Sequence, residues 1–230
     1  MYLLPDWRDV FIPNHTAPGV HPFEFRTMAY QQTTTHQNGH DTEFQKFGTV
    51  IDRPLSLDHR VRLDSIENLN QILADTMALR DLYKKHHWQV SGPMFYQLHL
   101  LFDKHFGEQA GLVDTIAERI QTLGGVAIAM AQDVAETTRV TRPPRGREAV
   151  AVQLFRLLQA HELIIAEARD AAHVAAANGD DGTNDLLVSD VLRLNEFQVW
   201  WISEHLAGAG LVVERESAAA QPANAVAVHA

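Results

Sequence analysis

Five residues of the types that bind metal ions follow a regular spacing along the chain: His87, His99, Asp103, Asp114 and Glu118. His99 and Asp103 are four residues apart, and so are Asp114 and Glu118. Residues four apart on a helix lie on one face, one turn apart, so each pair can reach one ion. Imidazole and carboxylate donors suit Fe²⁺, Mn²⁺ or Zn²⁺ and are poor ligands for Cu⁺.

The two pairs are too far apart to share one ion within a single chain. Their midpoints are separated by fifteen residues, roughly 22 Å of helix at ~1.5 Å per residue. His99 and Glu118 are equidistant from position 108.5, and so are Asp103 and Asp114. If two copies of this helix lie antiparallel about a two-fold axis there, His99 faces the partner's Glu118, and two identical sites result.

Small residues occupy the predicted crossing point of these two helices. Gly107, Ala110 and Gly111 continue the same helix face, and glycine inside a helix costs about 0.5–1 kcal/mol relative to alanine. Their presence indicates a close approach of two helices. His87, at the end of the preceding helix, can reach the His99 end. A carboxylate–histidine site of this kind suggests Fe²⁺ oxidation rather than hydrolysis.

Composition narrows the chemistry further. The 230 residues include 13 histidines and no cysteine, so thiolate metal sites, disulfides and iron–sulfur clusters are excluded. The formal charge of −10 disfavours binding to nucleic acid phosphates. No run of 18 apolar residues is present, which predicts a cytoplasmic protein without a membrane span. The Glu-x-x-His motif of di-iron sites within one bundle is also absent.

The elements that must position these residues are four long helices. Helical periodicity predicts an irregular arm over 1–56, an all-α four-helix bundle over 57–206 and a low-complexity tail over 207–230. Ser91-Gly92-Pro93 separates the first two helices, and a crossover after Gly124-Gly125 leads to the third, predicted over about 147–178. The VAIAMA segment in this crossover is expected to form a short extra helix.

The stretch KKHHWQVSGPMFYQLHLLFDKHFGEQAGLVDTIAERIQTLGG resembles the signature of the Dps family, the mini-ferritins. The resemblance covers about residues 57–206. It implies a ferritin-like hollow dodecamer in which Fe²⁺ is oxidised by hydrogen peroxide at ferroxidase sites between subunits, with two irons per site and storage of ferric mineral. It assigns the ligand roles to His87, His99, Asp103, Asp114 and Glu118, and it suggests that Trp88 intercepts oxidising equivalents, although packing alone also explains that residue.

Other residues allow two interpretations. Asp180, Asp181 and Asp185 resemble acidic positions that line three-fold ion pores in the family, but Asp180 and Asp185 also suit helix capping. In the arm, His36 and His40, with Asp41 and Glu43 nearby, form either an accessory metal site or an ordinary polar segment. Met28 is an alternative start to Met1. Among the remaining histidines, we expect His86 at the surface and His161 in a structural role.

Two hypotheses compete with the ferroxidase. One is a nucleoid protein that shields DNA physically. The tails disfavour it: residues 1–61 hold five Lys or Arg against seven Asp or Glu, and residues 207–230 hold one against two. The connector arginines Arg139, Arg142, Arg145 and Arg147 are the best basic patch for it. The other is a helical shell that binds metal without redox turnover.

Overall fold

The computed structural model describes residues 43–207 of the chain. These residues form helices and no strand, which confirms the predicted all-α bundle. The elements in chain order are α1 (His59–Gln89), α2 (Phe95–Thr122), α3 (Ala131–Thr137), α4 (Val150–Ala177), α5 (Asp181–Asp185), the π-helical segment η2 (Leu186–Leu192) and α6 (Arg193–Glu204). None of the described helices has both the length and the apolar character needed to cross a membrane.

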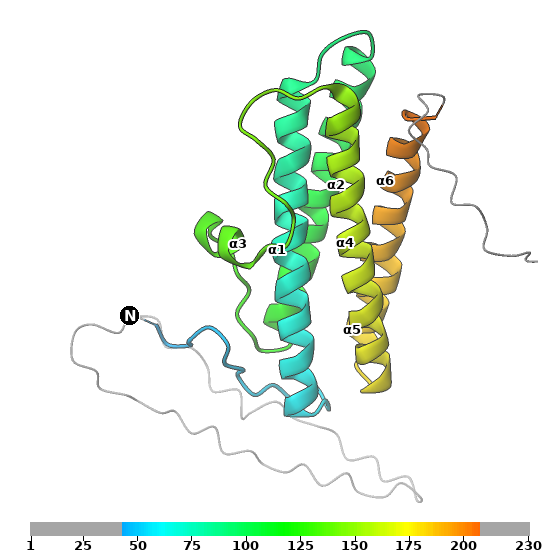
Figure 1. The fold of residues 1–230 in the computed structure, drawn as a ribbon. Coiled ribbons are helices and arrows are strands. Elements are labelled where there is room, and N and C mark those ends of the chain that lie inside the picture. Colours follow the sequence, from blue (N-terminus) through cyan, green and yellow to red (C-terminus); the bar gives the residue numbers. More distant parts are fainter. Residues whose placement is uncertain (1–42, 208–230) are drawn as a thin grey trace, which may run out of the picture. The chain divides into compact units, whose positions relative to one another are not determined.

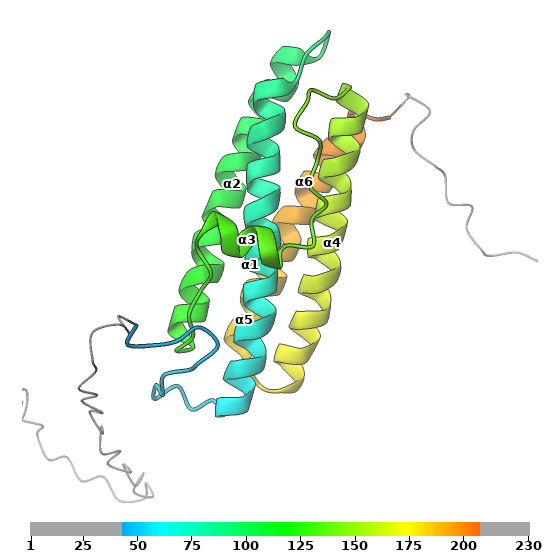
Figure 2. The ribbon, with the colours of Figure 1, turned by 60° about the vertical axis from the view of Figure 1, so that its left-hand side comes forward.

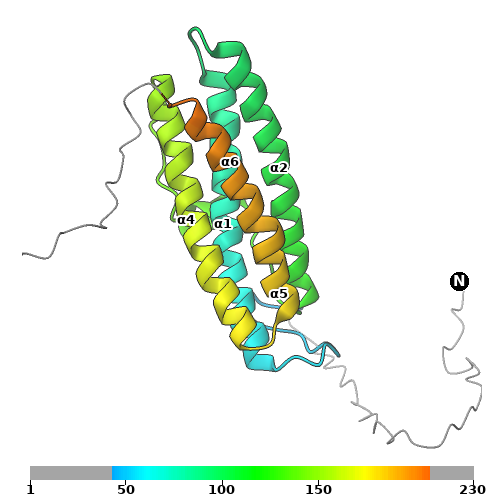
Figure 3. The same ribbon diagram turned by 90° about the vertical axis from the view of Figure 1, so that its right-hand side faces the viewer.

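The bundle consists of four long helical segments, here called rods (Figure 1). The helices α1 and α2 form one hairpin, while α5, η2 and α6 follow one another as the fourth rod beside α4 (Figure 3). The connector between α2 and α4 returns along the length of the bundle, as the predicted crossover requires, and α3 lies across α1 (Figure 2). The hairpin brings the end of α1 beside the beginning of α2, where the candidate ligands are.

Apolar side chains from every rod fill the bundle core. The fully buried ones include Tyr83, Phe102, Leu69, Ile72, Leu73, Leu79, Leu98, Ile116, Ile120, Leu123, Leu154 and Leu157. Burial of such side chains contributes about 1.5–3 kcal/mol each. The core therefore fixes the rotation of each helix, and this rotation decides which residues of α2 face outward.

The extra helix was predicted at the wrong residues. It spans Ala131–Thr137, after most of the VAIAMA segment. The preceding residues stay non-helical because Asn70 of α1 binds their backbone: its amide nitrogen donates to Val126 O at 3.1 Å, and its amide oxygen accepts from Ile128 N at 3.0 Å. Ile128 is also buried in the core. A side chain distant in the sequence thus replaces the helical hydrogen bonds.

Residues 43–58 lie against the end of the bundle. The backbone N–H of Ile51 donates to Gly124 O at 2.8 Å, and Arg62 forms an ion pair with Asp52 at 2.5 Å. Gly124 has a φ of +90°, and a Cβ there would lie 2.2 Å from Ile51 O. Only glycine fits this clasp. Part of the segment predicted as an irregular arm is therefore held by the bundle.

Candidate metal centre

His87 and His99 hold each other in place across the turn between α1 and α2. His87 Nδ1 lies 2.7 Å from His99 O, and His99 Nδ1 lies 2.9 Å from His87 O. A carbonyl oxygen only accepts, so both Nδ1 atoms donate a proton there, and in the neutral form of each imidazole the lone pair is on Nε2. The rings stack with their centroids 3.7 Å apart. This reciprocal clamp fixes the orientation of the two candidate ligands.

Asp103 lies beside the clamp on the next turn of α2. Its Oδ1 is 4.0 Å from His87 Nε2 and accepts a hydrogen bond from Lys84 Nζ at 2.5 Å. The Lys84 ammonium lowers the pKa of Asp103 below its usual value, and the nearby histidines act in the same direction. The carboxylate is therefore ionised near neutral pH, and Lys84 holds the place of a cation. Lys84 was not expected from the sequence, although it lies three residues before His87.

The other half of the ligand set lies farther along α2. Asp114 and Glu118 are both exposed, on the same outward stripe as His99 and Asp103. Between the two pairs, Gly107 and Gly111 are exposed, and a Cβ added at either would meet no atom within 4 Å. We call the set His99, Asp103, Gly107, Ala110, Gly111, Asp114 and Glu118 the α2 stripe. It is a polar helix face whose centre carries only two glycines and the methyl group of Ala110.

One chain supplies only half-sites. The structure brings His87, His99 and Asp103 together, whereas Asp114 and Glu118 lie about three to five turns farther along α2. Within residues 43–207, no group of three or more histidine, aspartate or glutamate side chains is arranged to hold a metal ion. The donor types fit a divalent metal, but each half offers too few of them. A complete site needs ligands from elsewhere.

Comparison with known proteins identifies the family. The Ferritin-like domain model matches residues 66–210. An uncharacterised protein of Kitasatospora aureofaciens is 54% identical over 145 residues, which are 63% of this chain and 97% of the relative. The solved structure of DpsC from Streptomyces coelicolor superimposes with a TM-score of 0.72 at 57% identity, covering 74% of this chain and 99% of that one. This chain belongs to the Dps family.

A nutrient stress-induced DNA-binding protein of Nostoc is a further relative of this Dps-family chain. It is 36% identical over 155 residues, which are 67% of this chain and 84% of the relative. The solved Dps structure from Thermosynechococcus elongatus has a TM-score of 0.62 at 32% identity and covers 67% of this chain and 98% of its own. The matched region coincides with the helical bundle, which confirms the resemblance seen in the sequence.

The three acidic residues proposed for an ion pore have different environments. Asp180 is buried: its carboxylate pairs with Arg119 at 2.5 Å, accepts from Ser65 Oγ at 2.7 Å and caps Thr183 N at 3.1 Å. The capping interpretation is therefore what the structure shows for Asp180. Asp181 and Asp185 are exposed, and Asp185 accepts from Ser189 Oγ at 2.8 Å. Only these two present carboxylates to solvent.

The remaining candidates are readily placed. Trp88 is 69% exposed in the Dps-family chain and follows the clamp residue His87. Glu43 is exposed, while His36, His40, Asp41 and Met28 lie outside the described residues.

The prediction for His86 was wrong. This side chain is fully buried, and neither ring nitrogen has a hydrogen-bond partner among the described residues. Burial lowers its pKa to about 4. α1 packs against α2, α3 and α4. Because these helices cover more than one face of α1, residues such as His86 are buried as well.

The core of the bundle contains a polar cluster that spacing did not reveal. Its members come from α1, α2, α4 and α6 and are fully buried: Tyr83, His105, Gln109, His161, Asn195 and Gln198. Burial lowers the pKa of His161 to about 4 and that of His105 to about 3, so both are neutral near pH 7. We refer to this set as the core polar cluster. His161, for which a structural role was expected, joins this cluster through Tyr83 and Asn195.

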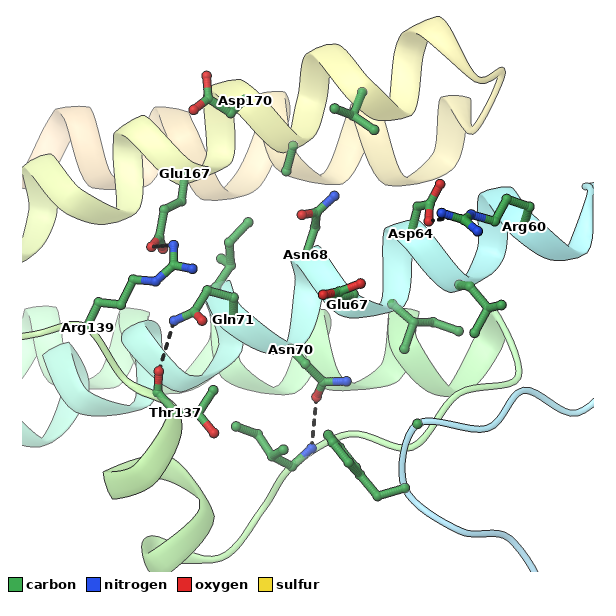
Figure 4. A pocket seen from close by; sticks show the side chains of 18 residues that line it. Arg60, Asp64, Glu67, Asn68, Asn70, Gln71, Thr137, Arg139, Glu167 and Asp170 are labelled. Carbon is green, nitrogen blue, oxygen red and sulfur yellow. Dashed lines mark hydrogen bonds and ion pairs between the residues drawn. The ribbon is translucent and has the colours of Figure 1, made fainter.

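A groove along α1, α4 and the connector contains a second group of charged residues (Figure 4). Glu167 pairs with Arg139 at 2.9 Å, and Gln71 donates to Thr137 O at 3.1 Å. Burial raises the pKa of Glu167 to about 7, assisted by the negative charge of Asp75. Asp75 is itself buried and accepts from Arg139 N at 2.6 Å. These contacts attach the connector to the bundle.

Proposed function

We propose that this protein is an iron-storage ferroxidase that oxidises Fe²⁺ with hydrogen peroxide at sites shared between two subunits. The observation that supports it most is the reciprocal clamp of His87 and His99 at one end of the α2 stripe. It leaves two free Nε2 atoms beside the ionised Asp103, while the matching carboxylates lie exposed at the stripe's other end. Iron is the substrate, and the protein supplies the ligands that hold it.

Each complete site joins the two ends of the stripe across a two-fold axis. His87, His99 and Asp103 of one subunit face the partner's Asp114 and the partner's Glu118. The open centre at Gly107 and Gly111 gives the two α2 helices room to approach. Two iron ions bound side by side can each give one electron to peroxide, so that the O–O bond is cleaved without release of hydroxyl radical. Six such dimers form the dodecameric shell of the family, which would store the ferric product.

Removal of one ligand from either end of the stripe tests the site. In His99→Ala and in Glu118→Ala, the rapid rise of ferric absorbance on adding peroxide to anaerobically bound Fe²⁺ should be lost, with the shell intact by size-exclusion chromatography. Glu162→Ala, an exposed change on α4, is the control. Oxidation at the parental rate in both ligand variants would contradict the proposal. Fe²⁺ binding without oxidation in the parent would instead favour a metal-binding shell.

A mixing experiment tests whether the sites are shared. A dimer of one His99→Ala chain and one Glu118→Ala chain has one site with both defects and one site with neither. Random reassembly of equal amounts should restore about a quarter of the parental sites. Sites confined to single chains would regain no activity on mixing.

DNA protection is the second candidate function. A relative carries a DNA-binding name, and Arg142, Arg145 and Arg147 are exposed in the connector. Contacts between arginines and phosphates release counterions, so binding would weaken steeply with salt. A mobility shift of duplex DNA at low salt that is lost in the triple Arg→Gln variant would support it. The net charge of −10 argues for a weak interaction.

A further inference from the structure

Tyr83 is a fully buried phenol held between two histidines. Its hydroxyl oxygen lies 2.5 Å from His161 Nε2 and 3.1 Å from His105 Nδ1. The rings of both histidines meet the Tyr83 ring at centroid distances of 5.6 Å and 5.2 Å. A phenol in a helical core needs only one hydrogen-bond partner. Two imidazoles around one phenol make a more elaborate arrangement than stability requires.

The hydrogen-bond network fixes where the protons are. Asn195 Nδ2 donates to Val191 O at 2.7 Å, so its Oδ1 faces His161 Nδ1 at 2.7 Å as an acceptor. His161 Nδ1 therefore carries a proton, and its Nε2 accepts the hydrogen bond from the Tyr83 hydroxyl. His105 Nδ1 then donates to the Tyr83 oxygen. The phenol proton is thus aimed at an imidazole nitrogen that is free to take it.

Tyr83 also lies close to the candidate metal centre. It precedes His87 by four residues on α1, which is one helical turn or about 6 Å along the axis. The Tyr83 ring packs on Phe102 with a centroid distance of 6.1 Å, and Phe102 directly precedes Asp103. Lys84, the next residue after Tyr83, binds the Asp103 carboxylate. Both ends of the half-site are therefore connected to this tyrosine by direct packing or one turn of helix.

We propose that Tyr83 donates an electron to the metal centre when only one Fe²⁺ is bound there, with His161 accepting the phenol proton. This proposal rests on the proposed ferroxidase function. One Fe²⁺ gives peroxide one electron, and Tyr83 gives the second. The O–O bond breaks, both oxygens leave as hydroxide, the phenol proton stays on His161, and Tyr83 becomes a neutral radical. The overall change is from Fe²⁺, H₂O₂, tyrosine and neutral histidine to Fe³⁺, two OH⁻, tyrosyl radical and protonated histidine.

Burial distinguishes Tyr83 from the tryptophan and the other tyrosine near the site. Trp88 and Tyr96 are 69% and 67% exposed in the single chain, so a radical on either would be less shielded than one on Tyr83. Burial raises the pKa of Tyr83 well above its usual value, and for this reason its electron can leave only if the proton leaves too. His161 is neutral near pH 7 because burial lowers its pKa to about 4. Its Nε2 therefore carries no proton and can accept the one from the Tyr83 hydroxyl.

The test uses electron paramagnetic resonance on the full-length assembled protein. Fe²⁺ is added anaerobically at one ion per site, peroxide follows at one equivalent, and the sample is frozen. The parent should show a neutral tyrosyl signal that changes its hyperfine splitting when the protein is made with ring-deuterated tyrosine. Tyr83→Phe should lose the signal, while Tyr96→Phe, the exposed matched control, should keep it. His161→Gln should also lose it, because an amide accepts the hydrogen bond but not the proton.

A second variant covers a folding failure of Tyr83→Phe. The chain has four tyrosines, and the triple variant Tyr2→Phe, Tyr30→Phe, Tyr96→Phe leaves Tyr83 as the remaining one. It should retain the whole signal. Loss of the signal in this triple variant, or its survival in Tyr83→Phe, would overturn the proposal. Stopped-flow oxidation at two Fe²⁺ per site tests the ferroxidase separately: a parent that oxidises iron rapidly but forms no tyrosyl radical contradicts only the inference about Tyr83.

Discussion

The α2 stripe and the core polar cluster are two polar regions built on opposite principles. The stripe is largely exposed, its ligands stand in two pairs on one face of one helix, and its centre carries only two glycines and an alanine. The cluster is fully buried, its members come from four helices, and most of its polar atoms are paired within the chain. One region is incomplete without a partner, whereas the other is nearly complete in a single chain.

The difference shows where each region's requirements are met. Buried polar groups must find partners within the fold, because an unpaired one costs about 1–3 kcal/mol. Exposed ligands can remain unpaired in water until a second subunit and an ion arrive. Substitutions in the stripe should therefore impair assembly or iron oxidation while leaving the stability of the single chain unchanged. Substitutions in the cluster should lower the stability of the single chain.

The largest expected effect is on assembly. Gly111→Leu places a bulky side chain where the two α2 helices of the proposed dimer approach, and it should convert the proposed shell into small species that lack rapid iron oxidation. The free energy of unfolding of the single chain should not fall, because a Cβ at Gly111 meets no atom within 4 Å and leucine favours a helix over glycine by about 0.5–1 kcal/mol. Analytical ultracentrifugation and urea denaturation measure the two properties.

Gly146→Leu is the matched control for this change. Gly146 is also exposed with no atom within 4 Å of an added Cβ, but it lies in the connector. It should assemble normally. If Gly111→Leu assembles a normal shell, the two α2 helices do not approach each other at Gly111 as proposed.

An intermediate effect is expected for acid stability through the core polar cluster. The pKa of His161 is lowered to about 4 from 6.5, so the unfolded chain binds more protons than the folded one between these values. The free energy of unfolding should thus fall as pH is lowered from about 6.5 towards 4, by up to about 3 kcal/mol for this residue. His161→Gln should be less stable at pH 7 but should lose less on acidification. Equal pH dependence in parent and variant, measured by urea denaturation, would place the acid sensitivity elsewhere.

The smallest effect is expected at Glu167. Its side chain is partly buried, and its Oε2 atom has no hydrogen-bond partner among the described residues. Its pKa is raised to about 7 from 4.5, so the stability that its protonated form provides is lost as pH rises through about 7. Glu167→Gln imitates the protonated form and should stabilise the protein by about 1 kcal/mol at pH 8 and by nothing at pH 5. Glu162→Gln, an exposed change on the same helix, should have no effect at either pH. If the difference in stability between Glu167→Gln and the parent is the same at pH 5 and pH 8, the charge of Glu167 is not its cause.

Much of the fold could be predicted from the sequence because its signals are local. Apolar residues every three or four positions indicated the long helices, and the glycine-containing turns indicated their ends. The short helix was misplaced because Asn70, more than fifty residues earlier, binds the backbone of residues 126–128. Nothing within the VAIAMA segment itself reveals that contact.

The two polar regions also differed in whether local spacing in the sequence could reveal them. The α2 stripe could be recognised because its residues repeat along one helix, and the structure places two of them, His99 and Asp103, beside His87 of α1. The core polar cluster was missed because Tyr83, His105, His161 and Asn195 have no spacing in common. The π-helical segment η2 directly precedes α6, where Asn195 lies, and includes Val191, whose carbonyl accepts from Asn195. It has no sequence signal that we recognised.

The symmetry of the α2 stripe limits how the gene can change. One residue inserted between Asp103 and Asp114 would turn one pair of ligands about 100° relative to the other, and because both subunits carry the insertion, both sites of a dimer would be lost at once. The connector over 123–149 lies outside this interval. Among descendants of this sequence, α2 should therefore keep a constant length between its ligands, while insertions and deletions should accumulate in the connector.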